Sequence, residues 1–126
     1  MKLEAKLAAG LNQQLTLERY SSAIYLAMSG EFEAKNLVGI AKWFRKKASE
    51  EDVHAGKFFD YIADRGAAPF VDALQIPAIP ADTDALVEFF WASLKHEQLV
   101  SARIFALIQE AQGVKELPLA RTMYRC

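Results

Sequence analysis

Residues 11–32 read LNQQLTLERYSSAIYLAMSGEF, and the heptad series through this stretch is Leu11, Glu18, Tyr25 and Phe32. Positions seven apart return to nearly the same face of a helix, so the series marks one inward seam. The seam is apolar or aromatic except at Glu18. An ionised carboxylate alone in a core costs on the order of several kcal/mol, so buried charges are expected to be paired or to bind metal. Glu18 is therefore a candidate site residue.

Two further heptad series share this composition. They are Leu37, Phe44, Glu51 and Phe58, followed by Phe90, Glu97, Ile104 and Ala111. Each series again contains one carboxylate, and His54 lies on the same helix face as Glu51, three residues later. Three carboxylates and an imidazole that converge inside a bundle are typical of a metal site.

The apolar periodicity predicts a single all-α domain over residues 1–126. Its elements are three helices and a short C-terminal remnant, at about residues 6–32, 37–65, 82–112 and 118–126. Gly66 and Gly113 follow the second and third helices, where glycine is a common stop signal. The intervening link contains Pro69, Pro77 and Pro80, so it is expected to be extended.

The lengths of the links predict how the helices are arranged. The first link is short, which makes the first two helices antiparallel neighbours. The second link, residues 67–81, has about 15 residues, which is long for a helix connection. It can span on the order of 45 Å, enough to run back along a helix. The third helix is therefore expected to be parallel to the second, in a bundle with a long crossover.

This arrangement places the three glutamates at one depth. Glu18 lies 18 residues before Asn36, in the first turn, and Glu51 lies 15 residues after it. At about 1.5 Å per residue, they stand roughly 27 and 23 Å from that turn. Glu97 lies 15 residues after Asp82, near the start of the third helix, so a parallel third helix brings it level. A buried ion-pair network would need basic residues on the same seams, and none is clearly placed there.

The donor atoms indicate which metal is bound. Carboxylate oxygens with one imidazole, and without thiolates, are unsuited to a tetrahedral structural zinc site. Glutamates that bridge two ions favour a pair of iron or manganese ions. In carboxylate bundles of that type, two helices each give a Glu and two others each give Glu-x-x-His. Glu18 and Glu97 fit the first role, and Glu51 with His54 fits the second.

The composition gives no reason to expect nucleic acid or a membrane as a partner. The chain has 126 residues, 52% of them hydrophobic, and a net charge of −1. No apolar run approaches a membrane span, and residues 1–11 do not resemble a secretory signal. The only cysteine is Cys126, so an intrachain disulfide is not expected. These features favour a cytoplasmic location.

Beyond these inferences, the chain resembles a bacterial non-haem ferritin over about residues 11–112. The matching stretches are residues 11–14, 18–22, 41–45, 50–54, 60–66 and 96–98. The resemblance implies a ferritin-like up-down bundle with a ferroxidase centre that holds two iron ions. Glu18 and His54 would hold one iron, Glu51 would bridge, and Glu97 would hold the second.

The resemblance also implies roles for two neighbours of these ligands. Glu50 would correspond to a ligand of a third, weaker iron site, and its alternative interpretation is a solvated helix residue. Tyr25 would lie beside the diiron centre as part of the catalytic set, and its alternative is core packing with a hydrogen-bonded hydroxyl.

The implied function is iron storage with ferroxidase activity. Dioxygen or peroxide would oxidise Fe²⁺, and the product would be stored as mineral inside a hollow homo-oligomer, a 24-subunit cage if the assembly follows the family. The family has a full fourth helix with further ligands, which is expected to be truncated here. Two alternatives stay open: a truncated ferritin subunit that binds metal without efficient catalysis or storage, and another diiron carboxylate enzyme, such as a peroxidase or oxygenase.

Overall fold

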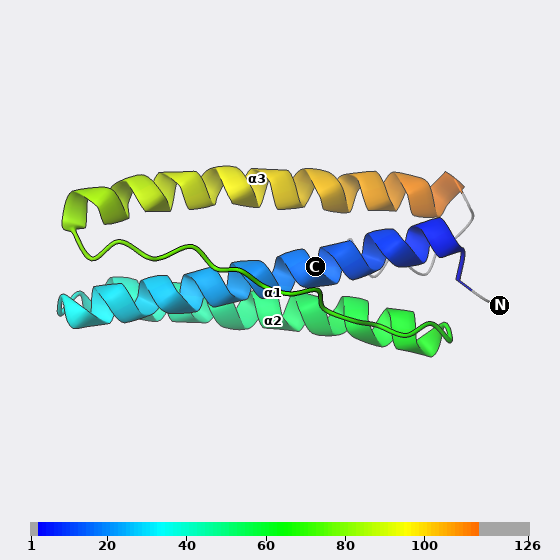
Figure 1. Cartoon of the computed structure of the whole chain (residues 1–126), viewed down its shortest axis with the longest axis horizontal. Coiled ribbons are helices and arrows are strands. Elements are labelled where there is room, and N and C mark those ends of the chain that lie inside the picture. The colour runs from blue at the N-terminus through cyan, green and yellow to red at the C-terminus, as the bar shows by residue number, and fades with distance from the viewer. Residues whose placement is uncertain (1–2, 114–126) are drawn as a thin grey trace.

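The computed structural model describes residues 3–113, which form three long helices. They are α1 (Ala5–Ala34), α2 (Val38–Asp64) and α3 (Thr83–Gly113). The link between α2 and α3 runs back along the bundle, so α3 is parallel to α2 and antiparallel to α1 (Figure 1). The predicted all-α bundle with a long crossover is confirmed. The predicted remnant at 118–126, including Cys126, lies outside the described residues.

Local sequence signals set the ends of the helices. Asn36, in the turn after α1, has φ 61°, and Gly66, after α2, has φ 79°. Both values lie in the left-handed region, which glycine adopts without steric cost and which asparagine tolerates. Asp82 accepts a hydrogen bond from the backbone N–H of Ala85 at 3.1 Å and thereby caps α3.

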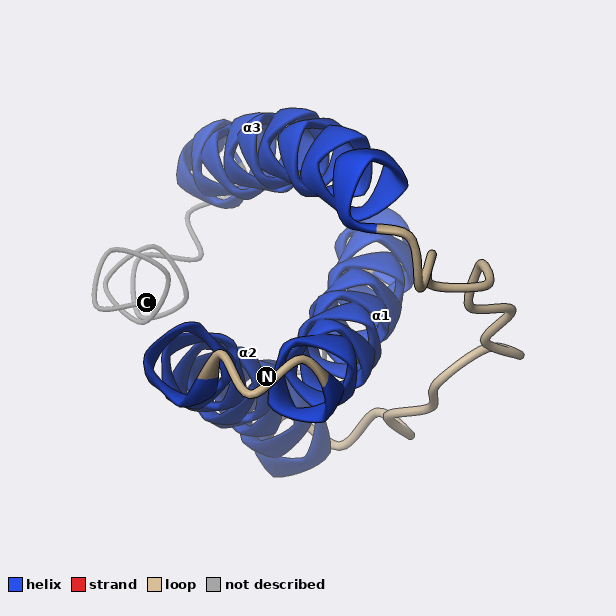
Figure 2. Ribbon diagram, turned by 90° about the vertical axis from the view of Figure 1, so that its left-hand side faces the viewer, coloured by secondary structure: helices blue, strands red, loops and turns tan. Residues whose placement is uncertain are grey.

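Helix α1 lies between the other two helices and contacts both of them (Figure 2). At Gly10, a Cβ atom would come within 2.9 Å of Leu107 Cδ2, so glycine allows α3 to approach closely.

Side chains of α1 form hydrogen bonds with the crossover. The backbone N–H of Phe70 donates to Oδ1 of the buried Asn12 at 2.9 Å, a contact that joins the crossover to α1. None of the three described helices is long and apolar enough to cross a membrane.

Within residues 3–113, the core contains two apolar clusters, one in each half of the bundle. The first contains Leu3, Leu7, Leu11, Leu15, Ala55, Phe58, Ile62, Leu107 and Ile108. The second contains Ile24, Tyr25, Met28, Phe44 and Ala48. Along α1 and α2, the buried residues Glu18 and Glu51 fall between these clusters. The fold therefore holds two carboxylates in a layer with apolar packing on both sides.

Candidate metal centre

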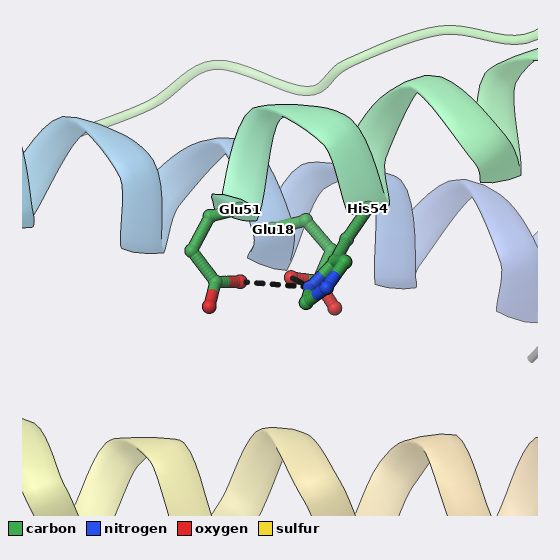
Figure 3. A group of neighbouring side chains, drawn as sticks. All are labelled: Glu18, Glu51 and His54. Carbon is green, nitrogen blue, oxygen red and sulfur yellow. Dashed lines mark ion pairs between the residues drawn. The ribbon is translucent and has the colours of Figure 1, made fainter. Parts of the chain in front are cut away.

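Three of the predicted site residues come together at the middle of the bundle. Glu18 from α1 and Glu51 and His54 from α2 point toward one another (Figure 3). One ligand atom from each residue lies within 4.8 Å of the other two. The i, i+3 spacing places Glu51 and His54 on one face of α2, and the packing of α2 on α1 brings that face to Glu18. We call these three residues the triad.

The ring of His54 lies between the two carboxylates. Its Nδ1 is 3.7 Å from Glu18 Oε2 and 3.6 Å from Glu51 Oε2. Glu18 is 0% exposed and Glu51 is 5% exposed, whereas His54 is half-buried. Both distances exceed a normal hydrogen bond and leave the carboxylate oxygens available to a cation.

One buried oxygen of the triad lacks a hydrogen-bond partner among the described residues. Glu18 Oε2 is buried and has no hydrogen-bond partner within residues 3–113. Leaving a buried acceptor unpaired costs about 1–3 kcal/mol, and more when the group is charged. A cation among two carboxylates and an imidazole would offset that cost, and oxygen-rich donors with one imidazole suit iron or manganese.

The ionisable groups of the triad shift one another's pKa values. Burial favours a raised pKa for Glu18, but interactions with His54, Glu51 and Gln14 outweigh burial and lower the pKa of its carboxyl. Burial raises the pKa of Glu51, with the Glu18 carboxylate as a further cause, against the opposing effect of His54. The two carboxylates raise the pKa of His54 to about 9. The metal-free triad therefore holds a proton on His54 at neutral pH.

We expect metal affinity to rise with pH because a metal ligand must be unprotonated. With a His54 pKa of about 9, nearly all of the imidazole is protonated at pH 7 and must lose its proton to bind. The affinity for Co²⁺ should therefore increase by up to about tenfold per pH unit between pH 6.5 and 8.5. Calorimetric titrations across this range measure the slope. His54→Gln should remove most of it, and a flat profile in the unaltered protein would contradict the prediction.

Glu97, on α3, lies outside the triad. Its side chain is half-buried, and its Oε1 accepts a hydrogen bond from the Tyr25 hydroxyl. Burial raises the pKa of Tyr25, followed by this hydrogen bond and then by the charges of Glu97, Glu51 and Glu18. Tyr25 is therefore close enough to sense all three carboxylates. Ligation of a second metal by Glu97 stays a prediction.

Glu50 is placed apart from the triad. Its side chain is exposed on α2, and its Oε2 lies 3.8 Å from Lys47 Nζ. This position matches the solvated alternative considered from the sequence, and its role at a third metal site stays a prediction.

Gln14 is a further residue next to the triad, and the heptad pattern of the sequence did not identify it. This residue is 0% exposed, and its Nε2 donates a hydrogen bond to Glu18 Oε1 at 2.9 Å. It lies one turn before Glu18 on the same face of α1. The i, i+4 spacing of an amide and a carboxylate was the signal that could have identified it.

Fold and site together define a ferritin-like helical bundle with a buried carboxylate–histidine site. A family model of the ferritin-like domain matches residues 8–123, and the chain belongs to the ferritin family. It is 34% identical to the bacterial non-heme ferritin of Escherichia coli O157:H7, over 92% of this chain and 69% of that protein. Its identity to the bacterial non-heme ferritin of Bacteroides fragilis (strain YCH46) is also 34%, over 90% and 70% of the two chains.

Solved structures show the same fold. Chlorobium tepidum ferritin superposes with a TM-score of 0.87 at 29% identity, over 97% of this chain and 74% of that one. An open pore ferritin from Archaeoglobus fulgidus superposes with a TM-score of 0.85 at 30% identity, over 98% and 75% of the two chains.

Proposed function

We propose that this chain is an iron-storage protein with ferroxidase activity, in which Fe²⁺ is the substrate of the triad. The observation that carries the proposal is the convergence of Glu18, Glu51 and His54, in which a buried carboxylate oxygen of Glu18 has no hydrogen-bond partner within residues 3–113. Membership of the ferritin family and similarity to proteins named bacterial non-heme ferritin support it. The protein would act in the cytoplasm. Residues 1–126 would form a single domain.

In this proposal each residue has a distinct role. Glu18 and His54 hold one iron, Glu51 bridges, and Glu97 holds the second iron. The two Fe²⁺ ions together give two electrons, which with two protons reduce dioxygen to hydrogen peroxide, or hydrogen peroxide to two molecules of water. Buried carboxylates attract Fe³⁺ more strongly than Fe²⁺, because the Coulomb energy grows with the charge of the cation, so the site favours the oxidised product. Tyr25 holds the Glu97 carboxylate through its hydroxyl.

The proposal extends to where the product goes. Glu50, exposed next to the bridging residue, would serve a third, weaker iron site. The oxidised iron would then be stored as mineral inside a hollow homo-oligomer, with 24 subunits if the assembly follows the family.

One observation favours a second candidate function: Glu97 does not join the triad within the described residues. A subunit that binds a single metal at the triad, without efficient catalysis or storage, would have this arrangement.

Aerobic iron loading tests the proposal. Fe²⁺ is added in air, particle size is measured by light scattering, and iron per chain is measured by metal analysis. Storage predicts a large assembly that holds many irons per chain. A small oligomer with at most two irons per chain would overturn storage and support the second candidate. A Glu18→Ala, His54→Ala double variant separates oxidation at the triad from spontaneous oxidation in the buffer.

A further inference from the structure

Gln14 is a buried amide whose nitrogen and oxygen differ in their hydrogen bonding. Its Nε2 donates to Glu18 Oε1 at 2.9 Å, whereas its Oε1 is buried without a partner among the residues the structure describes. Burying an unpaired amide oxygen costs roughly 1–3 kcal/mol, a penalty that an apolar side chain of the same size would avoid. Packing therefore does not explain a glutamine at this position, and the contact with Glu18 is the feature to be explained.

The ionisation of Glu18 fixes the orientation of the amide. An ionised carboxylate only accepts hydrogen bonds, so Gln14 must present its NH₂ group to Glu18 and not its oxygen. The terminal torsion of a free glutamate is broad and roughly two-fold. A hydrogen bond to Oε1 restricts that torsion. The other oxygen, Oε2, then lies on the side of His54, 3.7 Å from its Nδ1.

We infer that Gln14 is a positioning residue of the metal centre, which holds the Glu18 carboxylate so that Oε2 faces the cation. The inference rests on the proposed function, because it requires that the triad binds metal. Gln14 acts through Glu18. Partners of this kind typically change metal affinity 10–100-fold when they are removed.

The test uses Gln14→Met, which keeps the length of the side chain and removes the donor. Co²⁺ is the probe, since its visible absorption reports the geometry of its ligands and its affinity can be titrated anaerobically without oxidation. We expect Co²⁺ to bind 10–100-fold more weakly, with an altered visible spectrum. Helix content and thermal midpoint in the absence of metal should stay close to those of the unaltered protein.

A matched control is Ser29→Ala. Ser29 is another buried polar residue of α1, and its hydroxyl donates to the Ala41 carbonyl at 2.8 Å. This variant loses a buried hydrogen bond without touching Glu18, so its Co²⁺ affinity and spectrum should not change. If Gln14→Met fails to fold, Gln14→Asn decides, because its shorter amide cannot reach Glu18 and should show the same loss.

The outcomes separate the inference from the function on which it rests. Equal affinity and an unchanged spectrum in a folded Gln14 variant would overturn the positioning role and leave the metal centre intact. Failure of the unaltered protein to bind Co²⁺ at the triad would overturn the metal centre, and the role of Gln14 would fall with it.

Discussion

Replacement of Glu51 with glutamine should lower the affinity of the metal centre for Co²⁺ by at least about 100-fold. Loss of an outer partner alone costs 10–100-fold, and this change removes a charged ligand while preserving the shape of the side chain. Glu51 contributes one of the three converging ligand atoms and is 5% exposed, so solvent cannot replace it easily. Anaerobic titration with Co²⁺ measures the loss.

The same variant should make the metal-free protein more stable. Burial and the neighbouring Glu18 carboxylate raise the pKa of Glu51 above its ordinary value of 4.5. A carboxyl with a raised pKa binds its proton more tightly in the folded state, so its contribution becomes unfavourable as the pH rises above the ordinary value. Glutamine removes this penalty. We expect a gain in the free energy of unfolding at pH 7 that disappears near pH 4, where the carboxyl is protonated in both the folded and the unfolded state.

Urea denaturation with a chelator present, at both pH values and one protein concentration, measures this gain. Glu33→Gln is a suitable control, since Glu33 is exposed near the end of α1 and the change in charge is the same. The control should alter neither metal affinity nor stability appreciably. A Glu51→Gln protein that binds Co²⁺ normally would show that Glu51 lies outside the centre. Lower stability at pH 7 would show that the metal-free site is not under electrostatic strain.

The arrangement of the helices could be predicted because two simple features determine it. Heptad seams identify the inward faces, and the extended link at 67–81 is long enough to return along the bundle. Gly66 marks the end of α2 because the next turn needs a positive φ, which glycine supplies. These signals are local in the sequence, so they do not depend on how side chains pack.

The site was predictable only in part. The convergence of Glu18, Glu51 and His54 could be predicted, because a charge on an apolar seam conflicts with burial and two of the residues share one helix. A heptad position gives a face and a depth, but not a distance across the bundle. The contact of Glu97 with Tyr25 depends on the rotation of α3 and on rotamers, which periodicity does not determine. Gln14 is neutral and carries no such conflict, so its role became visible only through its hydrogen bond.

The heptad seam also separates two adjacent phenylalanines of α2. Phe58 belongs to the seam that contains Phe44 and Glu51, and it is 0% exposed in the first core cluster. Phe59 is one position further round the helix and is 46% exposed. The two residues have the same chemistry and nearly the same height in the bundle, so a comparison of their alanine variants isolates the effect of burial.

Phe58→Ala should therefore lower the free energy of unfolding by about 3–5 kcal/mol, because it removes a fully buried ring and leaves a cavity in the first core cluster. Phe59→Ala should change it by less than about 1 kcal/mol. Urea denaturation followed by helical circular dichroism, at one protein concentration and with a chelator present, measures both values. Similar losses in the two variants would mean that Phe59 is buried against another chain in solution. Small losses in both would mean that the core around Phe58 can collapse into the space left by the ring.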